Sequence, residues 1–184
     1  MRRLFGRSPE RTAAHAAYTA LVAQARSPVF FARHGVPDTL DGRFEIIALH
    51  AFLVLHRLRG LAETQRFAQA LYDVMFADLD RALREMGTGD LSVGKQVKRM
   101  AAGFAGRIAA YQAGIEGAGD LAEALRRNIY GTVAEPAAAD LAALADYIRG
   151  QAVALAAQPV AQIVAGTVTF APPPLDSVHP APEI

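Results

Sequence analysis

Apolar residues recur every three or four positions through the segment 39–59, a strongly hydrophobic stretch of the chain. This period is typical of an α-helix that buries one face. Further apolar side chains at Ile46, Leu49 and Val54 widen that face until little of the helix is polar. The pattern therefore predicts a helix that lies in the core or lines a groove. The periodic positions are Phe44, Ile47, Ala48, Ala51, Phe52, Leu55 and Leu58.

The same spacing predicts helices along most of the chain. Ser8 followed by Pro9 combines an N-cap with a proline at the first helical position, and Gly60 provides a stop for the helix at 39–59. Met86 and Val153 extend the apolar stripes of two later helices, so both are expected to face inward. The expected helices are 8–25, 27–34, 39–59, 62–86, 90–116, 120–130 and 136–158, with one more turn at 160–165.

These segments predict an all-α fold, a single-domain helical bundle of about six to seven helices. A chain of 184 residues is long enough to bury a core without a metal or disulfide. The expected domain covers residues 1–166. Residues 167–184 form a Pro-rich C-terminal tail, which is expected to be extended or disordered because repeated prolines oppose helix and sheet.

Charge and cysteine content narrow the function. The chain has no cysteine, which excludes disulfides, thiolate catalysis and cysteine-ligated metal. Residues 1–60 carry nine Arg against four acidic residues, a net charge of +5. Residues 111–184 carry three basic residues against eight acidic ones, a net charge of −5. Such a gradient favours an encounter between the N-terminal half and anionic partners.

The chain offers no predicted membrane span. Its longest apolar run, residues 46–55, is interrupted by His50, whereas a bilayer span needs about 20 apolar residues. The first 26 residues are Arg-rich and poor in acids, as in a mitochondrial presequence. Ala and Arg are abundant throughout, however, and this favours a bacterial cytoplasmic protein.

The candidate motifs for nucleotide and calcium binding lack features that such sites require. Residues 89–95 match the phosphate-loop pattern G-x-x-x-x-G-K, but Gln96 replaces the required Ser or Thr and a predicted helix precedes the motif. Asp38, Asp41 and Glu45 lack the alternate spacing of a calcium loop. Asp41 and Glu45 instead suit the N-terminus of a helix, where acids oppose the helix dipole.

The histidines give no metal motif either. His50 and His56 are six residues apart and fall on different helical faces, whereas zinc sites use pairs four apart. A histidine in an apolar stretch is more often a hydrogen-bonded core residue, and we expect this for His50. No catalytic triad or paired-acid arrangement is found. The sequence therefore predicts neither an enzyme nor a cofactor or metal site.

The remaining signals concern binding. Wide apolar helices flanked by Arg33, Arg43, Arg57 and Arg59 have the composition of a groove for an apolar segment of another protein. The same apolar excess is more often plain core packing. Asp73, Asp78 and Asp80 spread around their helix and indicate a solvated, salt-bridged face.

Two separate strings of residues resemble those of a known family, the ubiquinol–cytochrome c chaperones. The first string is Arg33, Gly35, Val36, Pro37, Asp38, Thr39, Asp41, Gly42, Arg43 and Phe44. The second is Asp73, Phe76, Asp80, Leu83, Arg84, Glu85, Met86, Gly87, Gly89, Asp90, Gly94 and Lys98. The resemblance is strong from about residue 30 to 111 and weaker to 147, and leaves out the first helix and the tail.

The resemblance implies a non-catalytic chaperone that binds newly made cytochrome b and promotes assembly of respiratory complex III. It implies that the protein acts on the cytoplasmic side of the inner membrane, or on the matrix face of a mitochondrion. Ribosome or anionic membrane contact is compatible with the charge gradient, a small partner subunit is left open, and no DNA partner is expected. The candidate partner-binding residues are Arg33, Pro37, Asp38, Asp41, Arg43, Asp80, Arg84, Glu85, Asp90, Lys95 and Lys98.

One alternative stays open at this point. A helical enzyme or carrier that binds haem or a metal could use His50 and the acids between Asp38 and Glu45.

Overall fold

The protein is built of helices. A computed structural model describes residues 8–87 and 89–173, and no strand occurs within those ranges, which confirms the all-α prediction. The notably short members are α2, α8 and the 3-10 helix η1. The elements are α1 (Pro9–Ala25), α2 (Pro28–Ala32), α3 (Leu40–Leu58), η1 (Ala62–Thr64), α4 (Gln65–Glu85), α5 (Asp90–Ile115), α6 (Leu121–Asn128), α7 (Ala138–Ala156) and α8 (Val160–Val164).

Local signals explain where several helices begin and end. The Ser8 hydroxyl accepts a hydrogen bond from the Arg11 amide at 3.2 Å, so α1 starts at the predicted cap. The Asp120 carboxylate caps α6 in the same way by accepting from the Glu123 amide. Gly35 has a φ of +59°, a left-handed conformation that lets the chain leave α2 sharply.

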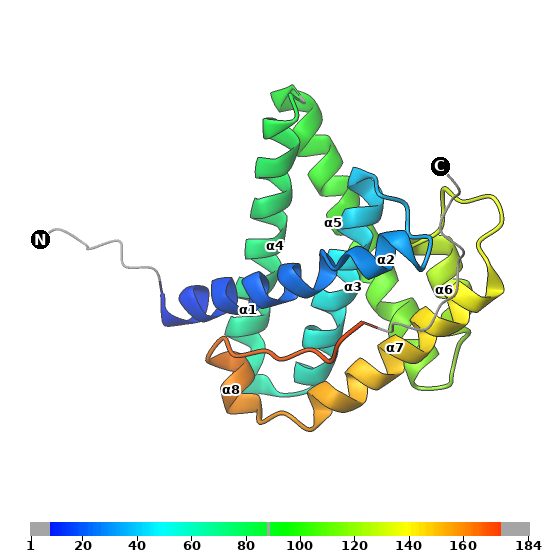
Figure 1. Cartoon of the computed structure of the whole chain (residues 1–184). Helices are drawn as coiled ribbons and strands as arrows, with labels where there is room; N and C mark the ends of the chain where they lie inside the picture. Colours follow the sequence, from blue (N-terminus) through cyan, green and yellow to red (C-terminus); the bar gives the residue numbers. More distant parts are fainter. Residues whose placement is uncertain (1–7, 88, 174–184) are drawn as a thin grey trace, which may run out of the picture.

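Helix α3 lies at the centre of the molecule (Figure 1). Side chains on nearly all its faces are buried, as the wide apolar pattern predicts. Helix α1 crosses α3 and α4, and α7 packs against α3. Helices α4 and α5 form a long antiparallel hairpin whose tip projects from the body (Figure 1). The core therefore gathers around α3, and the hairpin extends beyond it.

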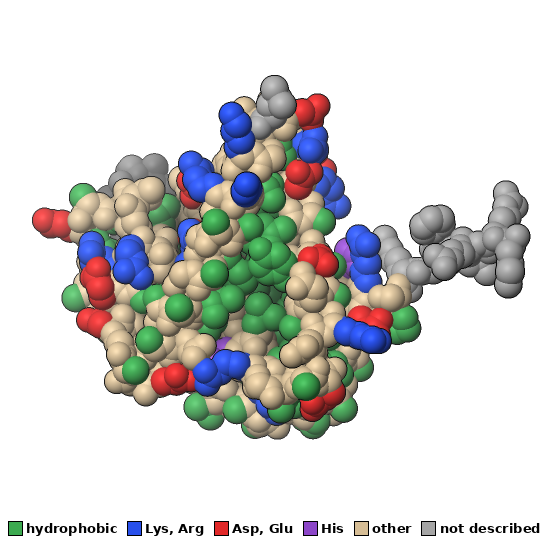
Figure 2. Space-filling view, turned by 180° about the vertical axis from the view of Figure 1, so that it is seen from behind, with side chains coloured by type: hydrophobic (Ala, Val, Ile, Leu, Met, Phe, Trp, Pro, Cys, Tyr) green, Lys and Arg blue, Asp and Glu red, His purple; other side chains and the backbone are tan. Residues whose placement is uncertain are grey.

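On the opposite face of the molecule, apolar and charged side chains occupy separate regions (Figure 2). In Figure 2, hydrophobic side chains gather in a hollow at the centre of this face, and charged side chains cover the projecting tip. Between α4 and α5, the rings of Tyr72, Phe76 and Phe104 pack at centroid distances of 4.6–6.0 Å. An aromatic cluster thus holds the two helices together below the charged tip.

Two expected core residues lie outside the core. Met86 is 55% exposed at the end of α4, and Val153 is 71% exposed on α7. The predictions for these two positions were wrong because helical spacing assigns a face but does not show whether a neighbouring element covers it. At both positions the described residues leave most of the side chain exposed.

The first part of the predicted tail is extended, as expected, and it packs on the body. Residues 167–173, here called the strap, run alongside α7 and α1 (Figure 1). The Gln158 side chain pairs with both the amide and the carbonyl of Thr169, at 3.1 and 2.6 Å. The Gln151 side chain pairs in the same way with Ala171, at 3.0 and 2.8 Å. Residues 174–184 of the tail lie outside the described residues.

Candidate functional site

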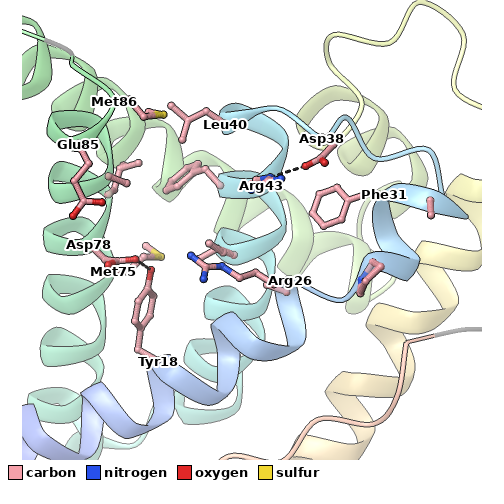
Figure 3. Close-up of a pocket in the computed structure, with 17 residues that line it drawn as sticks. Tyr18, Arg26, Phe31, Asp38, Leu40, Arg43, Met75, Asp78, Glu85 and Met86 are labelled. Carbon is pink, nitrogen blue, oxygen red and sulfur yellow. Dashed lines mark hydrogen bonds and ion pairs between the residues drawn. The ribbon is translucent and has the colours of Figure 1, made fainter.

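An apolar groove of about 870 Å³ opens between α1, α2, α3 and α4 (Figure 3). Its size is in the range of sites that enclose a ligand or the anchoring side chains of a partner. Met75 and Phe44 are buried at its floor, whereas Met86 reaches its mouth. The apolar lining consists of Phe31, Leu40, Phe44, Ile47, Met75, Leu79, Ala82 and Met86, with Ala25, Pro28 and Ala32 beside them.

A tight turn before α3 shapes one wall of this groove. A Cβ atom added to Gly42 would lie 2.0 Å from the Pro37 carbonyl oxygen, so only glycine lets the turn fold against the helix. The Thr39 hydroxyl accepts a hydrogen bond from the Gly42 amide at 3.1 Å and caps α3. This turn places Asp38 at the edge of the groove (Figure 3).

The charged groups at the rim are bound to one another. Arg43 Nε donates to Asp38 Oδ1 at 2.6 Å, and this hydrogen bond lowers the pKa of Asp38. The Tyr18 hydroxyl donates to Asp78 at 2.9 Å. Burial, followed by the charge of Asp78, raises the pKa of Tyr18, which therefore stays neutral. Apart from Arg26, the rim is thus a set of paired charges around an apolar floor.

Three of the candidate residues line the groove: Asp38, Arg43 and Glu85. Pro37 touches it indirectly, through its close contact with Gly42. The structure therefore brings residues from both family-like strings to one site. It does so because the N-terminus of α3 lies opposite the C-terminal half of α4 (Figure 3).

Three other candidates form an ion-pair cluster at the hairpin. Arg84 Nε pairs with Asp80 at 2.6 Å, and the same guanidinium also pairs with Asp90 across the turn. All three side chains are more than a third exposed. Lys95 and Lys98 are exposed on the first turns of α5, and Arg33 is exposed at the end of α2. These positions are separate from the groove.

Asp41 lies in a different, smaller pocket of about 360 Å³ between α3, α5 and α6. Glu45 and Arg107 meet beside it, with Arg107 Nε 2.6 Å from Glu45 Oε2. Their side chains are only 9% and 18% exposed, and burial raises the pKa of Glu45 despite the arginine. Sequence reasoning assigned Glu45 to the helix dipole and did not single out Arg107. A charged residue inside an otherwise apolar helix was the available signal that Glu45 needs a partner.

Of the four arginines expected to flank a groove, only Arg43 lines this one; Arg33 lies apart from it, and so do Arg57 and Arg59. Arg57 donates to the carbonyl oxygens of Leu155 and Gln158 at 2.9 and 3.1 Å, and so binds the C-terminal end of α7. Arg59 pairs with Glu116 at 2.5 Å. The interpretation was wrong for these two because they lie at the C-terminal end of α3, whereas the groove uses its N-terminal half.

His50 is the hydrogen-bonded core residue that the sequence favours. Its ring is fully buried, with Nδ1 2.8 Å from the Ile46 carbonyl and Nε2 2.8 Å from the Tyr147 hydroxyl. Gln24 in turn donates to that hydroxyl at 2.9 Å. Both ring nitrogens are occupied, so this arrangement leaves neither for haem or a metal. Across residues 8–87 and 89–173, no three His, Asp or Glu side chains converge as metal ligands would.

The described helices also include no candidate for a membrane span, since none is both long and apolar enough. This agrees with the interruption of the apolar run in α3 by a buried histidine.

Comparisons with known proteins found a similar sequence and a similar structure. The mouse (Mus musculus) ubiquinol-cytochrome c reductase complex assembly factor 1 is 29% identical over 136 residues, which cover 73% of this chain. The chain spans only 46% of the length of that relative. The crystal structure of the Cbp3 homolog from Brucella abortus matches with a TM-score of 0.77 and 35% identity, over 89% of this chain and 91% of that one.

A family model described as ubiquinol-cytochrome C chaperone matches residues 32–170. The match includes the groove-lining turn, α3 and α4, and extends past the expected limit at 147 into the strap. It confirms the resemblance carried by the two strings of residues. This chain belongs to the ubiquinol–cytochrome c chaperone family.

Proposed function

We propose that this protein is a non-catalytic assembly chaperone for respiratory complex III, and that it holds an apolar segment of newly made cytochrome b in the groove. Family membership and the name of the mouse relative, a complex assembly factor, support the general role. The single structural observation that carries the proposal is an open apolar groove lined by residues of both family-like strings.

The lining of the groove suits a protein segment. An amphipathic helix can lay its apolar stripe against such a surface, with the paired charges of the rim left in water. Met75 and Met86 are unbranched and polarisable, so they adapt to side chains of different shape. Burying the exposed side of Met86 against a client removes apolar surface from water and favours binding.

The chemistry at the rim favours holding over catalysis. Asp38 is bound to Arg43, and Asp78 is bound to both Tyr18 and Arg81. Both carboxylates therefore already accept hydrogen bonds from neighbouring side chains. We therefore propose no reaction and no cofactor at this site.

The proposed workplace is the cytoplasmic side of the inner membrane, with the matrix face of a mitochondrion as the alternative. The basic N-terminal half provides the charge for an encounter with the ribosome or an anionic membrane surface. Arg33, Lys95 and Lys98 are exposed and remain candidates for such contacts, as does the Asp80–Arg84–Asp90 cluster. A small partner subunit fits the proposal but is not required by it.

Photo-crosslinking in the native host tests the groove directly. A benzoylphenylalanine probe replaces Met86 at the groove mouth, and a matched probe replaces Val153 on α7, the other exposed large hydrophobic residue among those described. We expect mass spectrometry to identify cytochrome b in adducts of the Met86 probe only. Both substitutions exchange one exposed apolar side chain for another, so the fold is expected to tolerate them.

Two results contradict the proposal. Cytochrome b adducts of equal yield at both positions would place the client elsewhere on the surface. Adducts of the Met86 probe with a different protein would assign the groove to another client.

A further inference from the structure

Arg26 is a charged residue of the groove without a partner. It ends α1, and its guanidinium points into the space between α1 and α4 (Figure 3). It makes no side-chain hydrogen bond or ion pair with any residue in the described part of the chain. Arg43, on the same side of the groove, is bound to Asp38.

The nearby acids are already used by other side chains. Asp78 Oδ2 accepts from Tyr18, and Asp78 Oδ1 accepts from Arg81. Glu85 Oε1 lies 3.9 Å from Arg81 Nε. Each acid of the groove is thus paired with Arg43 or Arg81, and none forms an ion pair with Arg26 among the described residues.

A protein segment bound in the groove changes the surroundings of the Arg26 guanidinium. A helix that covers the apolar floor excludes water from the guanidinium, and a charge that loses water without gaining a partner destabilises the complex. A carboxylate on the occupant removes this cost because it matches the planar fork of arginine with two hydrogen bonds.

We propose that the client segment is an amphipathic helix with one carboxylate on its apolar face, and that Arg26 pairs with this carboxylate. The inference rests on the proposed function, because it specifies the segment that the groove receives. It also fixes an orientation. The wall formed by α4 carries Asp78 and Glu85, which repel an acid, whereas the opposite wall carries Arg26 and Arg43.

Binding of designed peptides tests this pairing. The probes are fluorescein-labelled helical peptides with a Leu, Phe and Met stripe, in which Glu, Gln or Lys replaces one residue of the stripe at a time. For one register, we expect the wild-type protein to bind the Glu peptide about tenfold more tightly than the Gln peptide, the effect of one charge-assisted pair. Fluorescence anisotropy gives the dissociation constants.

Charge variants identify the residue responsible. Arg26→Gln should abolish the preference for Glu, and it should not weaken the Gln peptide, because that complex then no longer buries an unpaired guanidinium. Arg26→Glu should reverse the preference toward the Lys peptide in the same register. The matched control is Arg66→Gln, which removes an exposed arginine of α4 that does not line this groove and should keep the preference intact.

The outcomes separate this inference from the function on which it rests. In one outcome the peptides bind and Met86→Glu lowers their affinity, but no register shows a preference that depends on Arg26. The proposed pairing is then wrong, whereas the groove is still supported as the client site. If Met86→Glu leaves binding unchanged, or no peptide binds at all, the groove is not the client site and both proposals fail.

Discussion

The ion pair between Glu45 and Arg107 makes the stability of this core depend on two single residues. It links α3 to α5 with both side chains mostly removed from water. Gly103 makes room for it, since a Cβ atom there would lie 2.4 Å from Arg107 Nη1. A buried pair adds little over an apolar pair, but one member left without the other is strongly destabilising.

We predict that Arg107→Met lowers the free energy of unfolding by about 3–5 kcal/mol, because the Glu45 carboxylate remains buried without its partner. Adding Glu45→Leu should recover most of that loss. Urea unfolding followed by circular dichroism measures both. The exposed pair is the control: Asp80→Ala with Arg84→Ala should cost only about 0.3–0.5 kcal/mol. A loss of similar size for the two pairs would show that burial does not distinguish them.

His50 predicts how stability depends on pH. Its neutral ring receives a hydrogen bond from Tyr147 and donates one to Ile46, and its ring neighbours are Phe30, Tyr147 and Phe170. Burial lowers the pKa of His50 from 6.5 to about 4. The unfolded chain therefore binds a proton more readily than the folded one between these values, so protonation favours unfolding.

The stabilising contribution of neutral His50 is fully present above pH 6.5 and is lost as the pH falls toward about 4. A shift of this size corresponds to a loss on the order of 3 kcal/mol. Urea unfolding at several pH values measures it, with His50→Phe as the variant that cannot titrate. The difference in unfolding free energy between the two proteins should shrink with falling pH in this window. A constant difference would contradict the assignment.

At the scale of elements, the strap joins parts of the fold that are distant in sequence. Gln151 lies on α7 and Gln158 just after its end, and their side chains bind the backbone of alternate strap residues, much as a neighbouring strand would. Val168 is buried, and the Phe170 ring lies 5.3 Å from that of His50. Gln24 of α1 also donates to the Ala171 carbonyl, so the strap contacts both helices.

Truncation after Gly166 should therefore destabilise the protein by on the order of 3 kcal/mol, through lost apolar burial and backbone hydrogen bonds. Truncation after Pro173 keeps every strap contact described and serves as the control. Thermal unfolding of the two proteins makes the comparison. Equal melting temperatures for the two truncated chains would show that the strap does not hold α7 and α1 together.

The elements differ in how far the sequence could predict them. The cap at Ser8 and the stop at Gly60 act within a few residues, so the limits of α1 and α3 were predictable. The partner of Glu45 lies 62 residues away, and the strap is held by glutamine side chains that follow no periodic pattern. Such long-range pairs depend on how the helices pack, which periodicity alone does not determine.

The same limit applies to the candidate site. The two family-like strings contain Asp38, Arg43 and Glu85, which line the groove. They could not separate the groove from the cluster around Arg84, because neighbours in sequence fall on opposite faces of α4. Arg26 lies outside both strings, at the end of a helix that they do not include.

At the scale of the whole molecule, charge is distributed unevenly along the chain, from +5 over residues 1–60 to −5 over residues 111–184. We predict binding to vesicles that contain anionic lipid, with the bound fraction falling steeply as salt increases, because exposed charges are screened within about 10 Å at 0.1 M salt. Co-sedimentation measures the bound fraction, and vesicles of neutral lipid are the control. Binding that ignores ionic strength would exclude an electrostatic encounter.

During synthesis, the residues of the groove are translated before those of the strap. Every one of the 17 residues that line the groove lies between Tyr18 and Met86, in the first half of the chain. The strap, at residues 167–173, follows all of them in the sequence. Since translation proceeds from the N-terminus, the walls of the groove are made before the segment that ties α1 to α7. A nascent chain thus contains every wall of the groove while the strap contacts are still untranslated.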